Sequence, residues 1–243
     1  MALLGRMDLT ERIDGLTWER DLNWITASDD KVTVSCNELS GGIQYRLRPF
    51  ADELGTGIST TEETLAEIAR GFLDRIGRPV EPQHLHLERV TYLYSQGVDV
   101  NGKKSDPAKL DAGLIFTRMI DELPVVGPGG LAMVKIGTDD TVVGGREIWR
   151  PIVQRGAKVP LRSPAEAMNL LEKQLKRARL EGDYYVCKAW QCYSESGIED
   201  AQRHLEPCYT FVVESLGNEF DTKKVVVIPA ARVGPMASFF TTA

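Results

Sequence analysis

The sequence predicts an α+β fold in which two helices each precede a set of antiparallel strands. Signals for a helix start, each followed by an apolar stripe, occur at 59–77 and again at 163–182. Behind each of them, β-branched segments alternate with turns rich in glycine and proline, which is typical of antiparallel sheets. The repeated order predicts an internal duplication: two tandem helix-plus-antiparallel-sheet units, preceded by an N-terminal β-hairpin.

Length and composition exclude several classes of protein. The chain has 243 residues, of which 42% are hydrophobic and 26% charged, and 29 basic against 35 acidic residues leave a net charge of −6. It is too apolar to be disordered, and it lacks the basic excess of a nucleic-acid-binding protein. No apolar run approaches the ~18 residues that a membrane helix needs. We therefore expect neither a nucleic-acid partner nor a membrane span.

The N-terminal part is predicted as an arm and β-hairpin over 1–58. Residues 1–22 are mixed polar and favour either a weak helix or an extended arm. β-branched alternation over 31–48, around the glycine turn at 40–42, predicts the hairpin itself.

The first helix-plus-sheet unit is predicted over 59–150. It begins with a capping box, in which Ser59 is the N-cap and Glu62 its partner three residues on. An apolar stripe at helical spacing follows, and Gly77 is the expected C-cap. Strands are then predicted at 84–95, 112–121, 131–137 and 141–149.

The second unit is predicted over 163–243, after a linker over 151–162 that is rich in proline and glycine. Ser163 and Glu166 form its capping box, and Gly182 closes its helix. Strands are predicted at 184–193, 207–216 and 223–230.

Two strand motifs carry a resemblance to a known family. Residues 116–127 read FTRMIDELPVVG, and a strand, an acidic turn and a further strand follow them. This order resembles PepSY-type domains and the related propeptide domains of secreted metallopeptidases, in which glycine usually stands at the position of Glu122. The segment LEPCYTF at 205–211 is similar to their L-x-P-x-Y-x-F strand. The resemblance implies a cystatin-like fold and a non-catalytic role in the cell envelope.

The leading functional hypothesis is a secreted or cell-envelope protein-binding module. It would act as an inhibitor, chaperone or sensor by holding another protein or peptide at a sheet edge or face, without a cofactor. One alternative is a small-molecule cyclase or isomerase, with a tyrosine-lined cavity and one acid–base carboxylate. Another is a structural subunit of an assembly, and a homo-oligomer also stays open.

Candidate binding residues lie at strand ends and on tyrosine-bearing strands: Arg118, Asp121, Trp149, Arg150, Tyr94, Tyr193 and Tyr209. For the enzyme alternative, Asp121 or Glu122 would be the acid–base group, helped by Arg118. Metal candidates are His84, His86 and Glu88, which would share one face of a strand. Because a His-x-His pair without a third spaced ligand is usually a solvated strand face, no metal is expected.

The cysteines and the N-terminus leave two compartments open. Cys192 and Cys208 flank the loop between two predicted strands and could face each other across a hairpin. A disulfide there would indicate export, whereas buried free thiols, the favoured interpretation, would suit the cytoplasm. The N-terminus has no signal-peptide pattern. The chain is therefore expected to be either cytoplasmic or the mature part of an exported protein.

Overall fold

The computed structural model describes residues 2–7, 14–47, 57–78, 81–156, 158–177, 183–216, 223–232 and 240–242. The chain forms two compact units. Unit 1 consists of Met1–Arg118, Gly130–Pro151 and Gly197–Ala201. Unit 2 consists of Met119–Gly129, Ile152–Ser196 and Gln202–Ala243. Each unit therefore combines segments that are far apart in the sequence.

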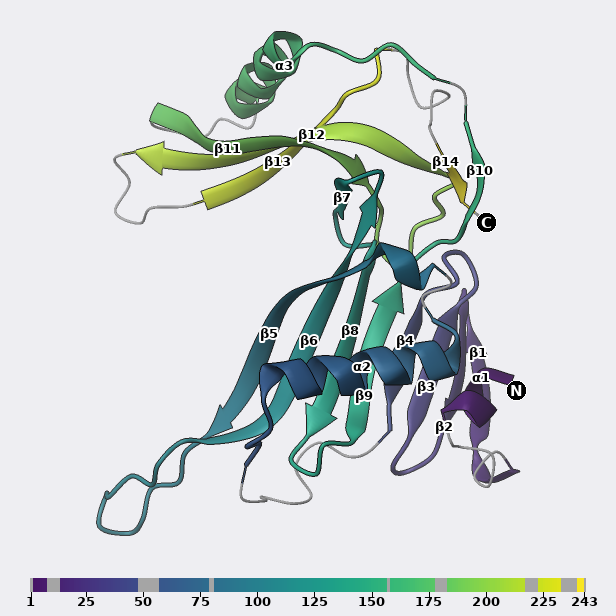
Figure 1. Cartoon of the computed structure of the whole chain (residues 1–243), viewed down its shortest axis with the longest axis vertical. Coiled ribbons are helices and arrows are strands. Elements are labelled where there is room, and N and C mark those ends of the chain that lie inside the picture. The colour runs from purple at the N-terminus through teal and green to yellow at the C-terminus, as the bar shows by residue number, and fades with distance from the viewer. Residues whose placement is uncertain are drawn as a thin grey trace. The chain divides into compact units, whose positions relative to one another are not determined.

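Unit 1 is an antiparallel sheet with a helix across one face (Figure 1). Its strands lie in the order β1-β2-β3-β4-β9-β8-β6-β5. Their bounds are β1 Thr17–Asp21, β2 Trp24–Ser28, β3 Thr33–Asn37, β4 Ile43–Arg46, β5 Leu85–Ser95, β6 Ala108–Ile120, β8 Leu131–Gly137 and β9 Val142–Ile148. The helices of this unit are α1 Ala2–Arg6, α2 Glu62–Ile76 and the short 3-10 turn η2 Pro82–His84.

Helix α2 forms because its ends are capped and one face is apolar. Its N-cap is Thr61, whose hydroxyl accepts the Thr64 amide at 3.3 Å, so the prediction of Ser59 as N-cap is wrong. Gly77 ends the helix in the left-handed region at φ 68°, which confirms the expected C-cap. The apolar face is buried in the core of unit 1 with alternate residues of the sheet: Leu65, Ala69, Phe72, Leu73, Ile76, Val34, Leu114, Val134 and Ile136.

Unit 2 contains strands β7 Leu123–Val126, β10 Ile152–Arg155, β11 Asp183–Ser194, β12 His204–Leu216, β13 Lys223–Pro229 and β14 Phe240–Thr242. Strand β12 pairs antiparallel with β11, β13 and β14, whereas β7 pairs parallel with β11. Helix α3, Pro164–Arg177, packs its buried Leu171 against Phe211 and Ile228 of the sheet.

The capping box of helix α3 is confirmed in both directions. The Ser163 amide donates to Glu166 Oε2 at 2.7 Å, and the Glu166 amide donates to Ser163 Oγ at 3.3 Å. The predicted helix end at Gly182 lies outside the described residues. Two segments inside the predicted linker also pair: strand β10 with β14, and Leu161 with Ala231.

The predicted fold class, two tandem helix-plus-antiparallel-sheet units of cystatin-like kind with a separate N-terminal hairpin, is wrong. In the part of the chain that the structure describes, strands dominate and form a large mixed sheet, and two helices, α2 and α3, are longer than two turns. Strand β4 of the predicted hairpin pairs with β9 and so belongs to the first sheet. Residues 123–126, which fall within the predicted first unit but where no strand was predicted, form β7 and pair parallel with β11 of unit 2. The predicted internal duplication is therefore wrong as well. A local sequence pattern can identify a strand, but it does not identify which other strand pairs with it.

Among the described residues, no helix has both the length and the apolar character that a membrane crossing requires.

Candidate functional site

The two faces of the unit 1 sheet differ in character. On β8, Ala132, Val134 and Ile136 are fully buried on the α2 side. Because side chains alternate along a strand, Met133 and Lys135 lie on the opposite face. The same alternation on β4 and β9 places Arg46 and Arg146 on that opposite face, which we call the open face.

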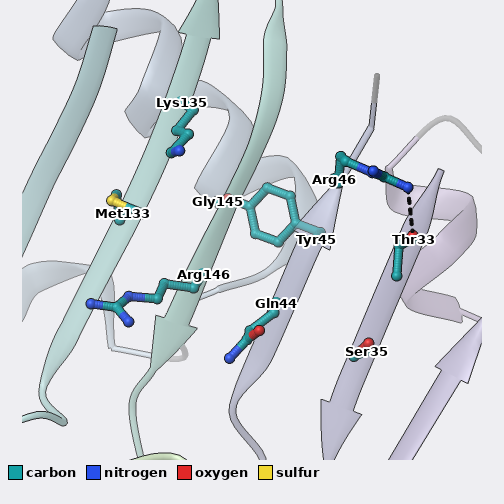
Figure 2. Close-up of a pocket in the computed structure, with 9 residues that line it drawn as sticks. All are labelled: Thr33, Ser35, Gln44, Tyr45, Arg46, Met133, Lys135, Gly145 and Arg146. Atoms are coloured by element: carbon teal, nitrogen blue, oxygen red, sulfur yellow. Dashed lines mark hydrogen bonds between the residues drawn. The ribbon is translucent and has the colours of Figure 1, made fainter. Parts of the chain in front are cut away.

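The open face holds a shallow pocket of about 470 Å³. Figure 2 shows the residues that line it, from strands β3, β4, β8 and β9: Thr33, Ser35, Gln44, Tyr45, Arg46, Met133, Lys135, Gly145 and Arg146. Of the lining residues that the structure describes, three are cationic and none is acidic. We refer to this feature as the cationic pocket.

Strand register explains the hollow between the cations. Gly144 of β9 is opposed by Arg46 on β4 and by Lys135 on β8. Opposed residues project to the same face, and neighbouring strands lie about 4.8 Å apart, so the two cations start about 10 Å apart. Gly144 has no side chain to fill the space between them. Arg146 lies two residues further along the same strand and face, which gives a glycine floor with cations on three sides.

Two of these cations have N–H groups that find no hydrogen-bond acceptor in the described part of the chain. Arg46 donates through Nη2 to Thr33 Oγ1 at 3.3 Å, whereas its Nε is buried without a hydrogen-bond partner (Figure 2). Arg146 extends from β9 towards β8 and makes no hydrogen bond or ion pair with the described part of the chain. A buried donor without a partner is unusual in a folded protein. The two guanidinium groups extend in opposite directions, Arg46 towards Thr33 on β3 and Arg146 towards β8 (Figure 2). Separate carboxylates or other anions would supply acceptors for each of them.

At the floor of the pocket, Gly145 of β9 lies very close to the backbone of β8 and to the side chain of Tyr45. A Cβ atom on Gly145 would lie 2.2 Å from the Met133 carbonyl oxygen and 2.5 Å from the Tyr45 hydroxyl, so this position requires glycine. The Tyr45 ring occupies that space and packs on Phe72, with ring centroids 5.5 Å apart. Burial raises the pKa of the Tyr45 hydroxyl, which therefore stays neutral near pH 7.

Three of the sequence-predicted residues form a buried cluster in unit 1. Arg118, Trp149 and Arg150 are all fully buried. Arg118 pairs with Glu81 and donates through Nη1 to the Arg150 carbonyl oxygen at 2.7 Å. Arg150 donates to the carbonyl oxygens of Gly197 and Asp200 at 2.7 and 2.6 Å, which ties a late segment of the chain to this unit. Through these contacts, the three residues connect segments of unit 1 to one another.

The two candidate carboxylates lie in the turn between β6 and β7. Asp121 accepts from Arg155 Nη2 at 2.8 Å, and both side chains are more than half exposed. Asp121 and Glu122 have positive φ values of 49° and 66°. The pKa of the neighbouring Tyr193 is raised, mainly by burial and further by the Asp121 charge, with Arg155 opposing.

The three candidate tyrosines have different surroundings. Tyr94 on β5 is 56% exposed. Tyr193 belongs to a small apolar cluster with Ile120, Val125 and Leu205. Tyr209 packs in the core beneath α3, and its hydroxyl donates to the Arg162 carbonyl oxygen at 2.8 Å. These positions do not assemble a tyrosine-lined cavity.

The histidine candidates do not share a regular strand face. His84 ends the turn η2 before β5 begins, and its Nδ1 lies 3.6 Å from Glu81 Oε2. The register of β5 shifts between Leu87 and Arg89, which interrupts the alternation at Glu88. Within the described residues, no three His, Cys, Asp or Glu side chains are grouped as metal ligands.

Sequence reasoning missed the cationic pocket. Its three cations come from β4, β8 and β9, whose sequence positions are up to 100 residues apart. Alternation within each strand indicates which side chains point outward. The pairing of β4 with β9, which brings them together, leaves no local signal in the sequence.

Comparisons with known proteins add only distant structural likeness. No family model matches the chain, and no curated protein matches it. The PepSY resemblance is therefore not shown. Among solved structures, the chain is similar to the crystal structure of an uncharacterized protein from Eubacterium rectale ATCC 33656, with a TM-score of 0.44 and 10% sequence identity. The match covers 95% of this chain and 78% of that one.

Proposed function

We propose that this chain is a protein-binding module whose cationic pocket holds an acidic segment of a partner protein. The observation that carries the proposal is the trio Arg46, Lys135 and Arg146 around a glycine floor, with no acidic residue among the described lining residues. Carboxylates of an acidic segment would accept hydrogen bonds from the guanidinium groups, and opposite charges would steer the encounter.

An acidic protein segment fits the pocket better than a nucleic acid does. The pocket is shallow and open, and its cations span three neighbouring strands, which suits a chain lying across the sheet. The whole chain carries a net charge of −6, whereas nucleic-acid affinity depends on many phosphate contacts from a broad basic surface. A local cluster of three cations on an acidic protein therefore favours a partner with few, closely spaced negative charges.

The test is a binding titration of the full chain with a fluorescently labelled peptide of about ten glutamates, followed by anisotropy. We expect saturable binding that weakens as salt is added. Arg146→Glu should weaken it about tenfold or more, because a contact charge is reversed. The matched control is Lys188→Glu on β11 of unit 2, which makes the same change in net charge outside the pocket and should leave the affinity unchanged.

Two results would overturn the proposal. Equal losses in Arg146→Glu and Lys188→Glu would mean that the peptide responds to net charge and not to the pocket. Binding of a single-stranded oligonucleotide of equal charge, with no binding of the peptide, would reassign the face to nucleic acid. The Arg46→Glu variant provides a second readout of the same pocket if Arg146→Glu fails to fold.

No observation favours the alternative functions. A cyclase or isomerase needs tyrosines around one cavity, and Tyr94, Tyr193 and Tyr209 lie in different surroundings. The structural-subunit alternative and the expected secreted or cell-envelope location both stay predictions.

A further inference from the structure

Two of the four cysteines are opposed across neighbouring strands of unit 2. Cys192 on β11 and Cys208 on β12 are register partners in an antiparallel pair. Opposed residues in such pairs have Cα atoms about 4.5 or 5.5 Å apart, depending on the hydrogen-bonding position. Both values lie inside the range of about 4.4–6.8 Å that a disulfide spans. The backbone therefore already has the separation that a disulfide requires.

The thiols also project to the same side of the sheet. Opposed residues share a face, and Cys192 Sγ lies 3.1 Å from Oγ1 of Thr210, which is two residues beyond Cys208 on that face. Both cysteines are buried, with 1% and 3% of their surfaces exposed. The other two cysteines are placed differently: Cys36 belongs to unit 1, and Cys187 is exposed on β11 beside Glu214.

We propose that Cys192 and Cys208 form an oxidisable dithiol site, which a small disulfide converts into an intrachain cross-strand disulfide. One thiolate attacks the small disulfide, forms a mixed disulfide and releases one small thiol. The second thiolate then displaces the other small thiol and closes the Cys192–Cys208 bond. The protein loses two electrons and two protons, and the oxidant gains them as it becomes two thiols.

The environment of the pair predicts when this reaction proceeds. Burial raises the pKa of the Cys208 thiol to about 12 and also raises that of Cys192. The thiolate, which is the reactive form, is therefore scarce in the folded protein at neutral pH. In the unfolded chain the thiols are solvated and have ordinary pKa values. The disulfide should form readily while β11 and β12 assemble, and slowly once they are packed.

The test is refolding of the full chain from denaturant, once with oxidised glutathione and once with a reducing agent. Each sample is then alkylated under denaturing conditions and weighed by mass spectrometry. We expect the oxidised sample to carry two alkyl groups where the reduced sample carries four, and a digest to link the Cys192 and Cys208 peptides. The oxidised protein should also unfold several degrees higher, and a reductant should reverse this shift.

Matched variants keep the outcome decisive. The double variant Cys36→Ala/Cys187→Ala retains the proposed pair and should form the same linked peptide. Cys192→Ala should remove it. Four alkylated cysteines after oxidative refolding, glutathione adducts alone, or links through Cys187 would each overturn the proposal. Because refolding exposes every thiol to the oxidant, an unreacted pair cannot be attributed to burial.

Discussion

The guanidinium carbon of Arg118 lies 5.0 Å from the centre of the Trp149 indole ring, and neither side chain is exposed. Glu81 accepts from both groups, through the ion pair with Arg118 and a 3.4 Å hydrogen bond from Trp149 Nε1. These three residues come from separate parts of unit 1. A buried charge pair stacked on an indole ties β6 and the end of β9 to the segment before η2.

Arg118→Met should destabilise unit 1 by roughly 3–5 kcal/mol, because it leaves the mostly buried Glu81 carboxylate without its cation. Urea unfolding measures the change. The double variant Glu81→Gln/Arg118→Met removes both charges and should lose less than the two single variants together. A loss below about 1 kcal/mol in Arg118→Met would show that Glu81 is adequately solvated without its partner.

Gly129→Ala should destabilise the protein by roughly 1–3 kcal/mol, because its Cβ would lie 2.3 Å from the Ser196 carbonyl oxygen. The loop cannot retreat easily, since the Gly129 amide donates to the Glu195 carbonyl oxygen at 3.1 Å. Gly71→Ala is the control, on an exposed position of α2 with nothing within 4 Å of the added atom. That variant should gain up to about 1 kcal/mol from helix propensity. Equal effects in the two thermal melts would contradict the close approach.

Glu122→Gly should stabilise the protein by about 1 kcal/mol. Asp121 and Glu122 form the two-residue turn between Ile120 and Leu123, which are register partners, and both have positive φ. Such turns favour glycine because other residues are strained in that region. Denaturant titration of Glu122→Gly and Glu122→Ala separates backbone relief from loss of the carboxylate. Only the glycine variant should gain stability, and an equal gain in both would point to the charge.

Stability under reducing conditions should fall as the pH rises above about 9. The Cys208 thiol has a pKa near 9.0 in the unfolded chain and about 12 in the folded protein, because burial disfavours the thiolate. The contribution of this thiol to the free energy of unfolding is fully present below pH 9. It is lost as the pH rises from 9 towards 12, because in that range the unfolded chain binds fewer protons than the folded protein does. Between pH 8 and 10 the free energy of unfolding should fall by about 1 kcal/mol more in the native protein than in Cys208→Ala. Parallel pH profiles would contradict the buried thiol.

Local sequence patterns predicted several elements correctly. The amphipathic stripe and Gly77 located α2, and the Ser163–Glu166 capping box located the start of α3. The strand predicted at 223–230 is β13, Lys223–Pro229. These features depend on residues within one or two turns of each other. The sequence alone contains the interactions that create them.

The same local patterns did not predict how the strands pair with one another. β-branched alternation marked β4, whereas no strand was predicted at the position of β7. The pairing of β4 with β9 and of β7 with β11 involves backbone groups that are alike in every strand. The prediction of tandem, duplicated units failed for this reason. Contacts between residues distant in the sequence also decided the surroundings of each candidate residue. Arg118 pairs with Glu81, and Asp121 pairs with Arg155.

The sequence by itself determined the two main helices, most strand segments and the acidic net charge, because each follows from residues that are neighbours in the chain or from composition. Only the tertiary structure decided the cationic pocket and the opposed Cys192 and Cys208. The pocket needs Arg46 and Lys135 on either side of Gly144, and the thiols need one particular register between β11 and β12. A shift of one residue in either pairing would turn these side chains to the other face, so register decides what each surface of the sheet can bind.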